Sequence, residues 1–375
     1  MTVQTAHAVP FFNYSHVFTS NEAEYISIIR DVGRRGSFIM QKDLTDFETN
    51  LARFLGAGHT LGVANATDGL HIALRAAGVR EGDEVIISSH TMIATAGAVH
   101  FAGGIPVPVE CGPDRLINPA AVEAAITART RAIMPTQLNG RTCDMDKLQS
   151  IADKHGLVII EDAAQALGSK FKGKCAGTFG VAAAISFYPA KVLGCFGDGG
   201  AVIANAAEIF ERAYQLRDHG RNQNGEIVSW GFNSRLDNLQ AAILDYGLKS
   251  YETVMTRRRK VASIYQEHLG DVSELILPPA PDSNPDHFDI YQNYEIEADK
   301  RDELKQYLKN HGIGTLIQWG GQAVHQLKAL GFTQDLPYTD YLFTRLLMLP
   351  INMAITDDDV AYVCEHVRRF YGSQM

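Results

Sequence analysis

The sequence predicts an α/β fold built on a mostly parallel sheet. Short apolar segments alternate with amphipathic helical segments through the first half of the chain, which is the pattern of strands joined by crossover helices. Segment 181–187 is apolar and rich in small and β-branched residues, as buried strands are. A chain of 375 residues also exceeds what one hydrophobic core usually contains. We therefore expect a large α/β domain over residues 1–256 and a smaller C-terminal α+β domain over residues 257–375.

The elements of the large domain follow from hydrophobic periodicity and from the positions of glycine. Two helices, at 21–32 and 42–55, are expected before the sheet, and Gly56 ends the second. Segment 60–74 predicts a short strand, a turn of small residues and the start of an amphipathic helix. Further strands are expected at 84–88, 105–109, 131–135, 157–161, 181–187 and 201–204, with helices at 118–128 and 144–155.

The rest of the chain predicts a connection and a small domain. A mostly helical, polar stretch from 206 to about 267 is expected to cross between the domains. In the small domain, strands are predicted at 292–298 and 314–319 and a final helix at 357–371.

Composition excludes several classes of protein. The net charge of −9 argues against a nucleic-acid surface, and the cationic run at 257–260 is interpreted as the solvated face of a helix. Five scattered cysteines without a Cys-x-x-Cys pair favour a reduced cytoplasm over a disulfide framework or a metal site. Because there is neither a long apolar stretch nor a leader, we expect a cytoplasmic protein that does not enter a membrane.

One lysine lies in surroundings that suggest chemistry. Lys191 follows the predicted strand 181–187, and four glycines between Gly194 and Gly200 let the backbone turn closely around a ligand. Asp162 ends another predicted strand, at the sheet edge where α/β folds bind ligands. The pair suggests pyridoxal phosphate, with Lys191 as the Schiff-base residue and Asp162 facing the pyridine nitrogen. The alternatives are a solvent-exposed lysine and an aspartate that caps a helix.

Such a cofactor needs a phosphate site, and segment 60–74 offers one. The N-terminus of the predicted helix presents free N–H groups to an anion near Ala66 and Thr67. The alternative is that Thr67 or Asp68 is only an N-cap. Glycines at 56–62 follow a helix and miss the dinucleotide-binding spacing by one residue, which makes a nicotinamide site a poor interpretation.

These segments together resemble a known family. Glu161-Asp162-Ala163-Ala164-Gln165 and Ser186-Phe187-Tyr188-Pro189-Ala190-Lys191 are similar to motifs of the DegT/DnrJ/EryC1/StrS nucleotide-sugar aminotransferases, which are fold type I pyridoxal-phosphate enzymes. The resemblance extends from Gly36 to Leu349-Pro350. It implies that Ala66, Thr67 and Ser186 bind the phosphate, that Gln165 contacts the ring hydroxyl, and that Asn233 is donated by the neighbouring subunit. A homodimer with shared active sites is therefore expected.

The sequence departs from the family at two positions. The residue that stacks on the ring is usually aromatic, whereas Met92 stands there, and His90 is an alternative for that role. A thioether can still pack on a ring. The usual Gly-Thr of the phosphate site is Ala66-Thr67, and the alanine fits only where its φ is negative.

The resemblance also implies a reaction. It is transfer of an amino group from glutamate to a nucleotide-linked keto sugar, for a surface polysaccharide or another glycan. Asp198, in Gly-Asp-Gly-Gly, and Tyr188 resemble members that aminate a 3-keto sugar, and His325 resembles a histidine near the sugar. The alternatives are amination at C4, a family offshoot that removes a hydroxyl and has histidine in place of the lysine, and a non-catalytic regulatory protein. Lys191 argues against the offshoot.

Overall fold

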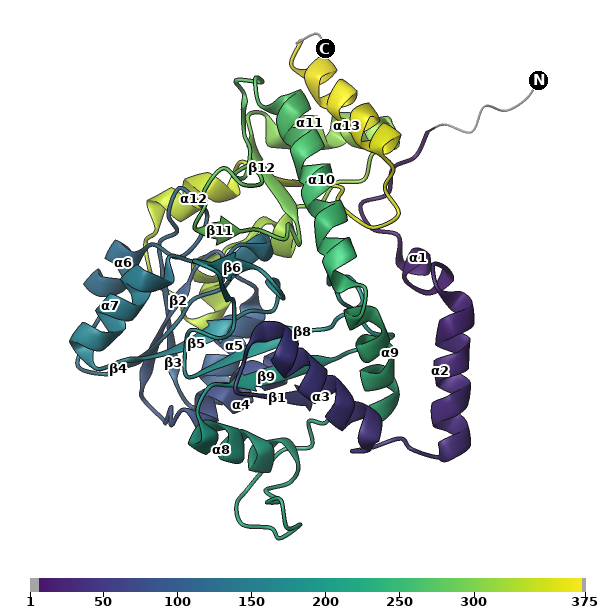
Figure 1. The fold of residues 1–375 in the computed structure, drawn as a ribbon. Coiled ribbons are helices and arrows are strands. Elements are labelled where there is room, and N and C mark those ends of the chain that lie inside the picture. Colours follow the sequence, from purple (N-terminus) through teal and green to yellow (C-terminus); the bar gives the residue numbers. More distant parts are fainter. Residues whose placement is uncertain (1–6, 373–375) are drawn as a thin grey trace.

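A seven-stranded sheet forms the centre of the larger lobe (Figure 1). The computed structural model describes residues 7–372. The strands of this sheet are β1 (His59–Val63), β2 (Glu84–Ser88), β3 (Ile105–Val109), β4 (Thr130–Met134), β5 (Val158–Asp162), β8 (Ala182–Ser186) and β9 (Gly200–Ala204). Their order is β1-β9-β8-β5-β4-β2-β3, and only β9 runs in the direction opposite to the other strands. The mostly parallel α/β fold is confirmed, and each predicted strand of this sheet after β1 lies within a residue of its observed position.

Alternating side chains of these strands pack into hydrophobic cores on both faces of the sheet. Val85 and Ile87 pack on one face with helices α4, α5 and α8, whereas Ile86 packs on the other face with α6 and α7. Helices α3 and α9 cover that second face over β8 and β9. The helices are α3 (Lys42–Leu55), α4 (Ala66–Ala76), α5 (Ile93–Phe101), α6 (Pro119–Ala124), α7 (Met145–His155), α8 (Ala207–Arg217) and α9 (Asn238–Leu248). Covering both faces leaves the carboxyl ends of the strands as the open edge.

The smaller lobe is built on the antiparallel sheet β10-β12-β13 and its own core. Its elements are α10 (Tyr251–Leu269), β10 (Leu275–Ile276), β12 (Tyr294–Ala298), α11 (Arg301–Asn310), α12 (Pro337–Phe343), β13 (Leu346–Leu349) and α13 (Asp357–Phe370). Short pieces complete the fold: β6 (Lys170–Phe171), β7 (Lys174–Cys175), β11 (His287–Phe288), and the 3-10 turns η1 (Leu138–Gly140), η2 (Gln318–Gly321), η3 (Val324–Gln326) and η4 (Lys328–Leu330). The predicted boundary at 256 and 257 falls within α10 and stays a prediction.

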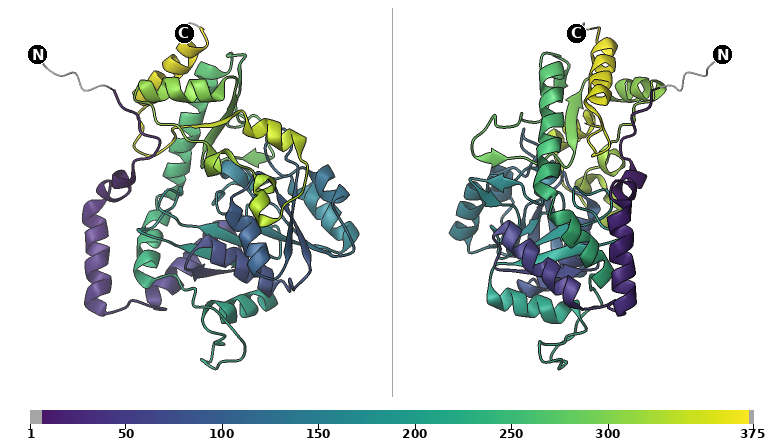
Figure 2. Two further views of the ribbon diagram at one scale, coloured as in Figure 1. Left: turned by 180° about the vertical axis from the view of Figure 1, so that it is seen from behind. Right: turned by 45° about the vertical axis from the view of Figure 1, so that its right-hand side comes forward.

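Two segments extend from this body. Helices α1 (Tyr14–Thr19) and α2 (Glu22–Arg35) stand at the side of the molecule, where α2 contacts α9 (Figure 2). The loop between α8 and α9 projects below the sheet (Figures 1 and 2). It holds Gly220 at φ 78° and Gly225 at φ 83°, which explains why the stretch from 206 to 267 is not one helix.

Three sequence interpretations are corrected by the structure. Segment 314–319 is not a strand, because it makes only an isolated bridge, between Leu316 and Met348, and turns into η2 at Trp319, whose φ is 50°. The predicted helix at 118–128 ends at Ala124. The cationic run on α10 is not wholly solvated: Arg258 is buried and donates to three backbone carbonyls.

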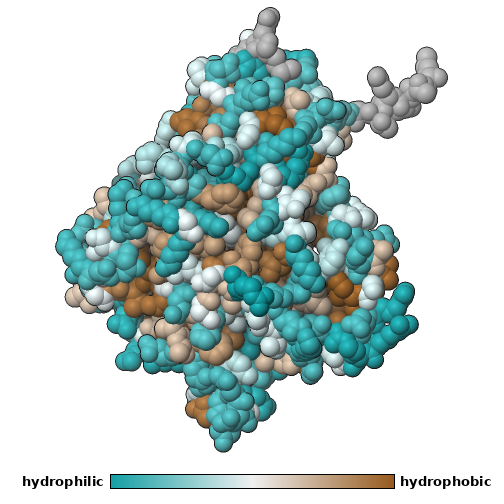
Figure 3. Space-filling view, viewed as in Figure 1, coloured by the Kyte–Doolittle hydropathy of each residue, from teal (hydrophilic) through white to brown (hydrophobic). Residues whose placement is uncertain are grey.

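The surface and the cysteines agree with an ordinary globular chain. All five cysteines are free and buried. Hydrophobic residues gather in several places on the otherwise hydrophilic face in Figure 3. Within residues 7–372, no helix has the length and apolar character needed to span a bilayer.

Candidate active site

Lys191 lies in a tight turn after β8. Its backbone N–H donates to the Tyr188 carbonyl at 2.8 Å, and the Cys195 N–H donates to the Phe187 carbonyl at 2.9 Å. Burial lowers the pKa of the Lys191 amine from the ordinary 10.5 to about 8, and the Asp162 carboxylate opposes this shift. The amine is therefore partly neutral, and nucleophilic, near physiological pH.

Asp162 ends β5, beside the Lys191 loop that follows β8. Its side chain is buried, and it accepts hydrogen bonds from Thr95 Oγ1 at 2.7 Å and from the Ala164 N–H at 3.2 Å. Burial raises the pKa of this carboxyl, while Thr95, Ala164 and Lys191 act in the opposite direction. A cationic partner close to this carboxyl would hold it in the ionised form.

A row of threonine hydroxyls supports Asp162, and the sequence did not reveal it. Thr91 Oγ1 lies 2.7 Å from Thr95 Oγ1 and 2.8 Å from Thr136 Oγ1. Since Thr95 gives its proton to Asp162, it accepts from Thr91, which in turn accepts from Thr136. The chain of donors thus points toward the carboxylate and polarises it. Only the strand-end position of Thr136 could have signalled this row.

The N-terminus of α4 forms the predicted anion cradle. Its N-cap is Asn65, whose Oδ1 accepts from the Asp68 N–H at 2.8 Å; Thr67 and Asp68 are not caps. Ala66 is the first helical residue and its φ is negative, so the alanine fits this turn. A Cβ on Gly200 would lie 2.7 Å from the Ala66 nitrogen, which shows how closely β9 approaches the cradle.

The other predicted cofactor residues surround the same edge of the sheet. Ser186 ends β8, and its Oγ accepts from the Tyr188 N–H at 3.3 Å. Gln165 Oε1 accepts from the Asn139 N–H at 2.9 Å, so its amide N–H groups point elsewhere. Met92 precedes α5 with its side chain exposed. Tyr188 is exposed too, and burial together with a hydrogen bond to Tyr188 raises the pKa of neighbouring Tyr14.

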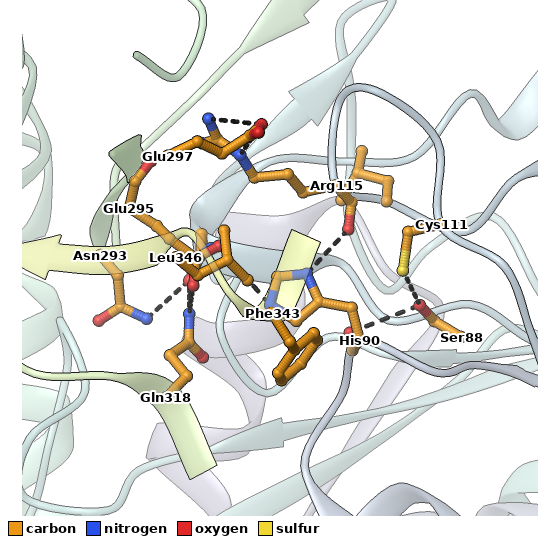
Figure 4. Close-up of polar contacts among 12 residues, drawn as sticks. Ser88, His90, Cys111, Arg115, Asn293, Glu295, Glu297, Gln318, Phe343 and Leu346 are labelled. Carbon is orange, nitrogen blue, oxygen red and sulfur yellow. Dashed lines mark hydrogen bonds and ion pairs between the residues drawn. The ribbon is translucent and has the colours of Figure 1, made fainter. Parts of the chain in front are cut away.

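His90 and His325, the two histidines predicted to lie near the cofactor ring and the substrate, are both buried. His90 Nδ1 lies 3.2 Å from the Arg115 carbonyl oxygen, and Nε2 lies 3.6 Å from Glu295 (Figure 4). His325 lies between Ser89 Oγ at 2.6 Å and Asp340 Oδ1 at 3.0 Å. Both rings are thus engaged inside the chain, and their contact with substrate stays a prediction.

Asn233 lies at the surface of the chain, next to a buried residue that contacts α4. It lies on the projecting loop, is exposed, and forms a backbone bridge with Asp218. The next residue, Ser234, is buried and donates to Asp68 Oδ2 at 2.7 Å, which ties the loop to α4. Asn233 is therefore placed at the surface, one residue from a side chain that contacts α4, the helix of the anion cradle.

The residues fit pyridoxal phosphate chemically. The Lys191 amine makes no hydrogen bond within residues 7–372, and the first N–H groups of α4 are likewise without a backbone partner there. A buried carboxylate, a desolvated amine and a helix N-terminus match a pyridinium, an aldehyde and a phosphate respectively. In the same part of the chain, no cluster of His, Cys, Asp and Glu is arranged to hold a metal ion.

Comparison with known proteins decides the family. Residues 19–368 match the DegT/DnrJ/EryC1/StrS aminotransferase family. The chain belongs to this family. Two curated members illustrate the relationship. A dTDP-3-amino-3,4,6-trideoxy-alpha-D-glucose transaminase of Streptomyces venezuelae is 38% identical, covering 96% of each chain. A UDP-2-acetamido-2-deoxy-3-oxo-D-glucuronate aminotransferase of Pseudomonas aeruginosa is 36% identical, covering 90% of this chain and 93% of the relative.

Solved structures agree with this family assignment. S. venezuelae DesV, in complex with a ketimine intermediate, is 37% identical and superposes with a TM-score of 0.93, covering 98% of this chain and all of that one. A family aminotransferase from Brucella abortus is 33% identical with a TM-score of 0.92, covering 97% and 100%. The predicted family, fold type, enzyme class and cofactor are thereby confirmed: the protein is a pyridoxal-phosphate-dependent sugar aminotransferase of fold type I.

Proposed function

We propose that the protein transfers an amino group from glutamate to the 3-keto position of a nucleotide-linked deoxysugar. The observation that carries the catalytic part is the pairing of the partly neutral Lys191 amine with buried Asp162. The 3-position is supported by relatives whose names contain 3-amino or 3-oxo sugars, in S. venezuelae and P. aeruginosa. Asp198, on the loop after Lys191, supports the same assignment.

The chain's own residues would divide the work as follows. Lys191 would bind the cofactor and then move the proton of the amino donor, which a neutral amine can accept. Asp162 would keep the cofactor's ring nitrogen protonated, and the N–H groups of Ala66 and Thr67, with Ser186, would hold its phosphate. Pyridoxal phosphate supplies an electron sink for the negative charge that develops on the donor carbon.

A panel of substrates tests this proposal. The holoenzyme is incubated with glutamate and with matched nucleotide-linked 3-keto and 4-keto sugars, and the position of nitrogen in each product is determined by NMR. We expect amination of the 3-keto sugar, with 2-oxoglutarate as the second product. Amination of only the 4-keto sugars would overturn the position, and an inactive glutamate with another active amino acid would overturn the donor.

A regulatory function is the second candidate. A "Pleiotropic regulatory protein" of Geobacillus stearothermophilus is 38% identical, covering 97% of this chain and 98% of the relative. The name does not exclude catalysis in that relative, since one fold supports different functions. For this chain, a holoenzyme that turns over none of the panel while retaining cofactor would favour regulation.

The proposal includes assembly and place of action. A homodimer in which each site takes Asn233 from the partner would bring this exposed side chain to an anion cradle. The role of the product in a surface polysaccharide is supported by a Bacillus subtilis spore coat polysaccharide biosynthesis protein, 33% identical, covering 86% of this chain and 88% of the relative. We place the enzyme in the cytoplasm, because five free cysteines fit a reducing compartment.

A further inference from the structure

We propose that Gln292 is a positioning residue that holds the Lys191 backbone from both sides. Its side-chain Oε1 accepts from the Val192 N–H at 3.0 Å, and its Nε2 donates to the Ala190 carbonyl at 3.1 Å. The two bonds bracket Lys191 and use one acceptor and one donor of a single amide. The inference rests on the proposed function only for the catalytic role of Lys191.

Gln292 belongs to a short strap, residues 290–293, that crosses from the small lobe to the open edge of the large sheet. The strap begins where the Ile290 N–H donates to the Gly140 carbonyl at 2.9 Å. A Cβ on Gly140, whose φ is 87°, would lie 2.6 Å from the Gln292 nitrogen. Only glycine permits this close backbone approach, so the strap is fitted tightly against the loop after β4.

The same strap also reaches the residue beside the expected cofactor ring. Asn293 Nδ2 donates to Asn139 Oδ1 at 2.8 Å, and the Asn139 N–H donates to Gln165 Oε1 at 2.9 Å. Asn139 holds a left-handed φ of 54° and donates from Nδ2 to Glu295 at 2.9 Å. Glu295 in turn accepts from Gln318 (Figure 4). The strap is therefore bonded to the backbone on both sides of Lys191 and, through Asn139, to the Gln165 side chain. These bonds fix the positions of Lys191 and Gln165 relative to one another.

A buried cation fixes the strap from behind. Arg258 on α10 donates from Nε to the Tyr291 carbonyl at 2.8 Å and from a terminal nitrogen to the Gln292 carbonyl at 2.7 Å. It also binds the Ile351 carbonyl at 2.9 Å. Hydrogen bonds from a charged donor are stronger than neutral ones, so the Gln292 backbone is held while its side chain faces Lys191.

The loop that Gln292 brackets offers a matched control. Gln240 on α9 makes the same pair of bonds to Phe196, accepting from its N–H at 2.9 Å and donating to its carbonyl at 3.1 Å. Gln240 thus holds the same glycine-rich loop through an equivalent pair of side-chain to backbone hydrogen bonds, but at Phe196, five residues after Lys191. A substitution there disturbs the loop without releasing the lysine.

The test compares Gln292→Met and Gln240→Met with the wild-type protein, all without cofactor. Hydrogen exchange is measured at the Val192 and Phe196 amides, and acetic anhydride labelling of Lys191 is followed over a pH series. We expect Gln292→Met to speed exchange at Val192 about tenfold, as the loss of one hydrogen bond allows. The labelling midpoint of Lys191 should also rise by about one pH unit, because a released side chain reaches water.

The control should show the opposite selectivity. Gln240→Met should speed exchange at Phe196 and leave the labelling midpoint of Lys191 unchanged. Equal midpoints in Gln292→Met and wild type, or equal shifts in both variants, would overturn the positioning role. If Gln292→Met does not fold, hydrogen exchange in the wild-type protein still tests the proposal. A Val192 amide that exchanges at the rate of an unprotected amide would show that Gln292 does not hold it.

Failure of the proposed function would look different. In that case the Val192 amide is protected by Gln292 as described, but the holoenzyme aminates no keto sugar. With an active holoenzyme, Gln292→Met should lower kcat more than it raises KM for the sugar, because Lys191 acts in the chemical steps. Unchanged kcat in a folded Gln292→Met variant would also overturn the inference.

Discussion

At the scale of single residues, the site depends on two ionisable groups that the fold removes from water. Burial moves the pKa of Lys191 down and that of Asp162 up, and each group's charge opposes the other's shift. Both shifts favour the neutral forms of the two groups. A neutral Lys191 amine can act as a nucleophile, and a cationic ligand beside Asp162 would return that carboxyl to its ionised form.

The first prediction is a pH dependence of cofactor capture. The neutral Lys191 amine attacks an aldehyde, so the capture rate by the apoprotein should rise about tenfold per pH unit below its pKa and level off above about 8. Stopped-flow absorbance measures this rate, and Lys191→Ala, which should capture nothing covalently, is the control. A rate that keeps rising toward pH 10.5 would contradict the lowered pKa.

The same lowered pKa affects stability. Between pH 8 and 10.5 the unfolded chain holds a proton on Lys191 that the folded chain has lost, so the contribution of Lys191 to the free energy of unfolding should increase as pH rises through that window.

The second prediction concerns Asp162. Asp162→Asn keeps the size of the side chain but removes the charge that would hold the ring nitrogen protonated, so single-turnover rates should fall about 10²- to 10³-fold. Cofactor should still bind, since the phosphate cradle and Lys191 are untouched. Thr95→Val, which removes a donor but keeps the carboxylate, serves as the graded comparison and should cost less. Near-normal rates in Asp162→Asn would exclude this role.

The sequence points most directly to candidate residues whose signal is local. Asp162 and Lys191 could be found because each follows a recognisable buried strand. Gln292 and Thr95 could not, since the partners of Gln292 lie 100 and 102 residues away along the chain, that of Thr95 lies 67 residues away, and nothing near either residue signals those bonds. Gln292 was interpreted as the start of a strand, but the strand begins at Tyr294.

At the scale of elements, the predicted phosphate cradle at the start of α4 lies in very close contact with β9. Gly200 pairs with Val63 and with Ser186 in the sheet, while its missing side chain leaves room for Asn65 and Ala66. The glycine is therefore needed for its small size, because its φ is not positive. Close contact of this kind keeps the first N–H groups of α4 aimed at one point.

The third prediction follows from this contact. A methyl group added by Gly200→Ala would lie 2.6 Å from the Asn65 carbonyl carbon, so the helix start must shift. We expect a loss of about 1–3 kcal/mol in the free energy of unfolding, as overpacking causes, together with weaker cofactor binding. Chemical denaturation and absorbance titration measure the two effects. Gly33→Ala on α2 meets nothing within 4 Å and should instead stabilise the protein slightly; an equal response of both variants would refute the close-contact explanation.

Elements of the large sheet were predictable because buried parallel strands are continuous apolar runs. The same criterion failed at 314–319, where an apolar segment pairs with no full strand. Its Gly314 instead packs against the backbone of Phe11, 303 residues away, where a Cβ would lie 2.5 Å from the Phe11 nitrogen. Contacts of this range decide whether a short apolar run becomes a strand, and local pattern does not contain them.

At the scale of the whole molecule, one predicted cofactor residue lies at the surface of the chain. Asn233 is exposed on the projecting loop, in the same segment as Trp230, which is 96% exposed. Exposed hydrophobic side chains also include Phe38, Met92, Tyr188 and Phe232. Large exposed apolar side chains are common at interfaces between subunits, and a two-fold dimer would cover the same surface on both copies.

The last prediction tests whether Asn233 completes the partner's site. A lost hydrogen bond to a charged phosphate costs about 1.5 to 3 kcal/mol, so Asn233→Ala should weaken cofactor binding about ten- to a hundredfold. Under limiting cofactor this variant is nearly inactive, and Lys191→Ala is inactive at any concentration. In their heterodimer, the shared-site arrangement places both defects in one site and neither in the other.

Co-refolding the two variants in equal amounts therefore gives opposite results for the two arrangements. If sites are shared, random pairing restores about a quarter of all sites, and activity rises above that of either parent. If Asn233 acts within its own subunit, every site keeps a defect and the mixture stays as inactive as its parents. Native mass spectrometry of the same sample verifies that heterodimers have formed, so that an inactive mixture counts against the shared site instead of against the pairing.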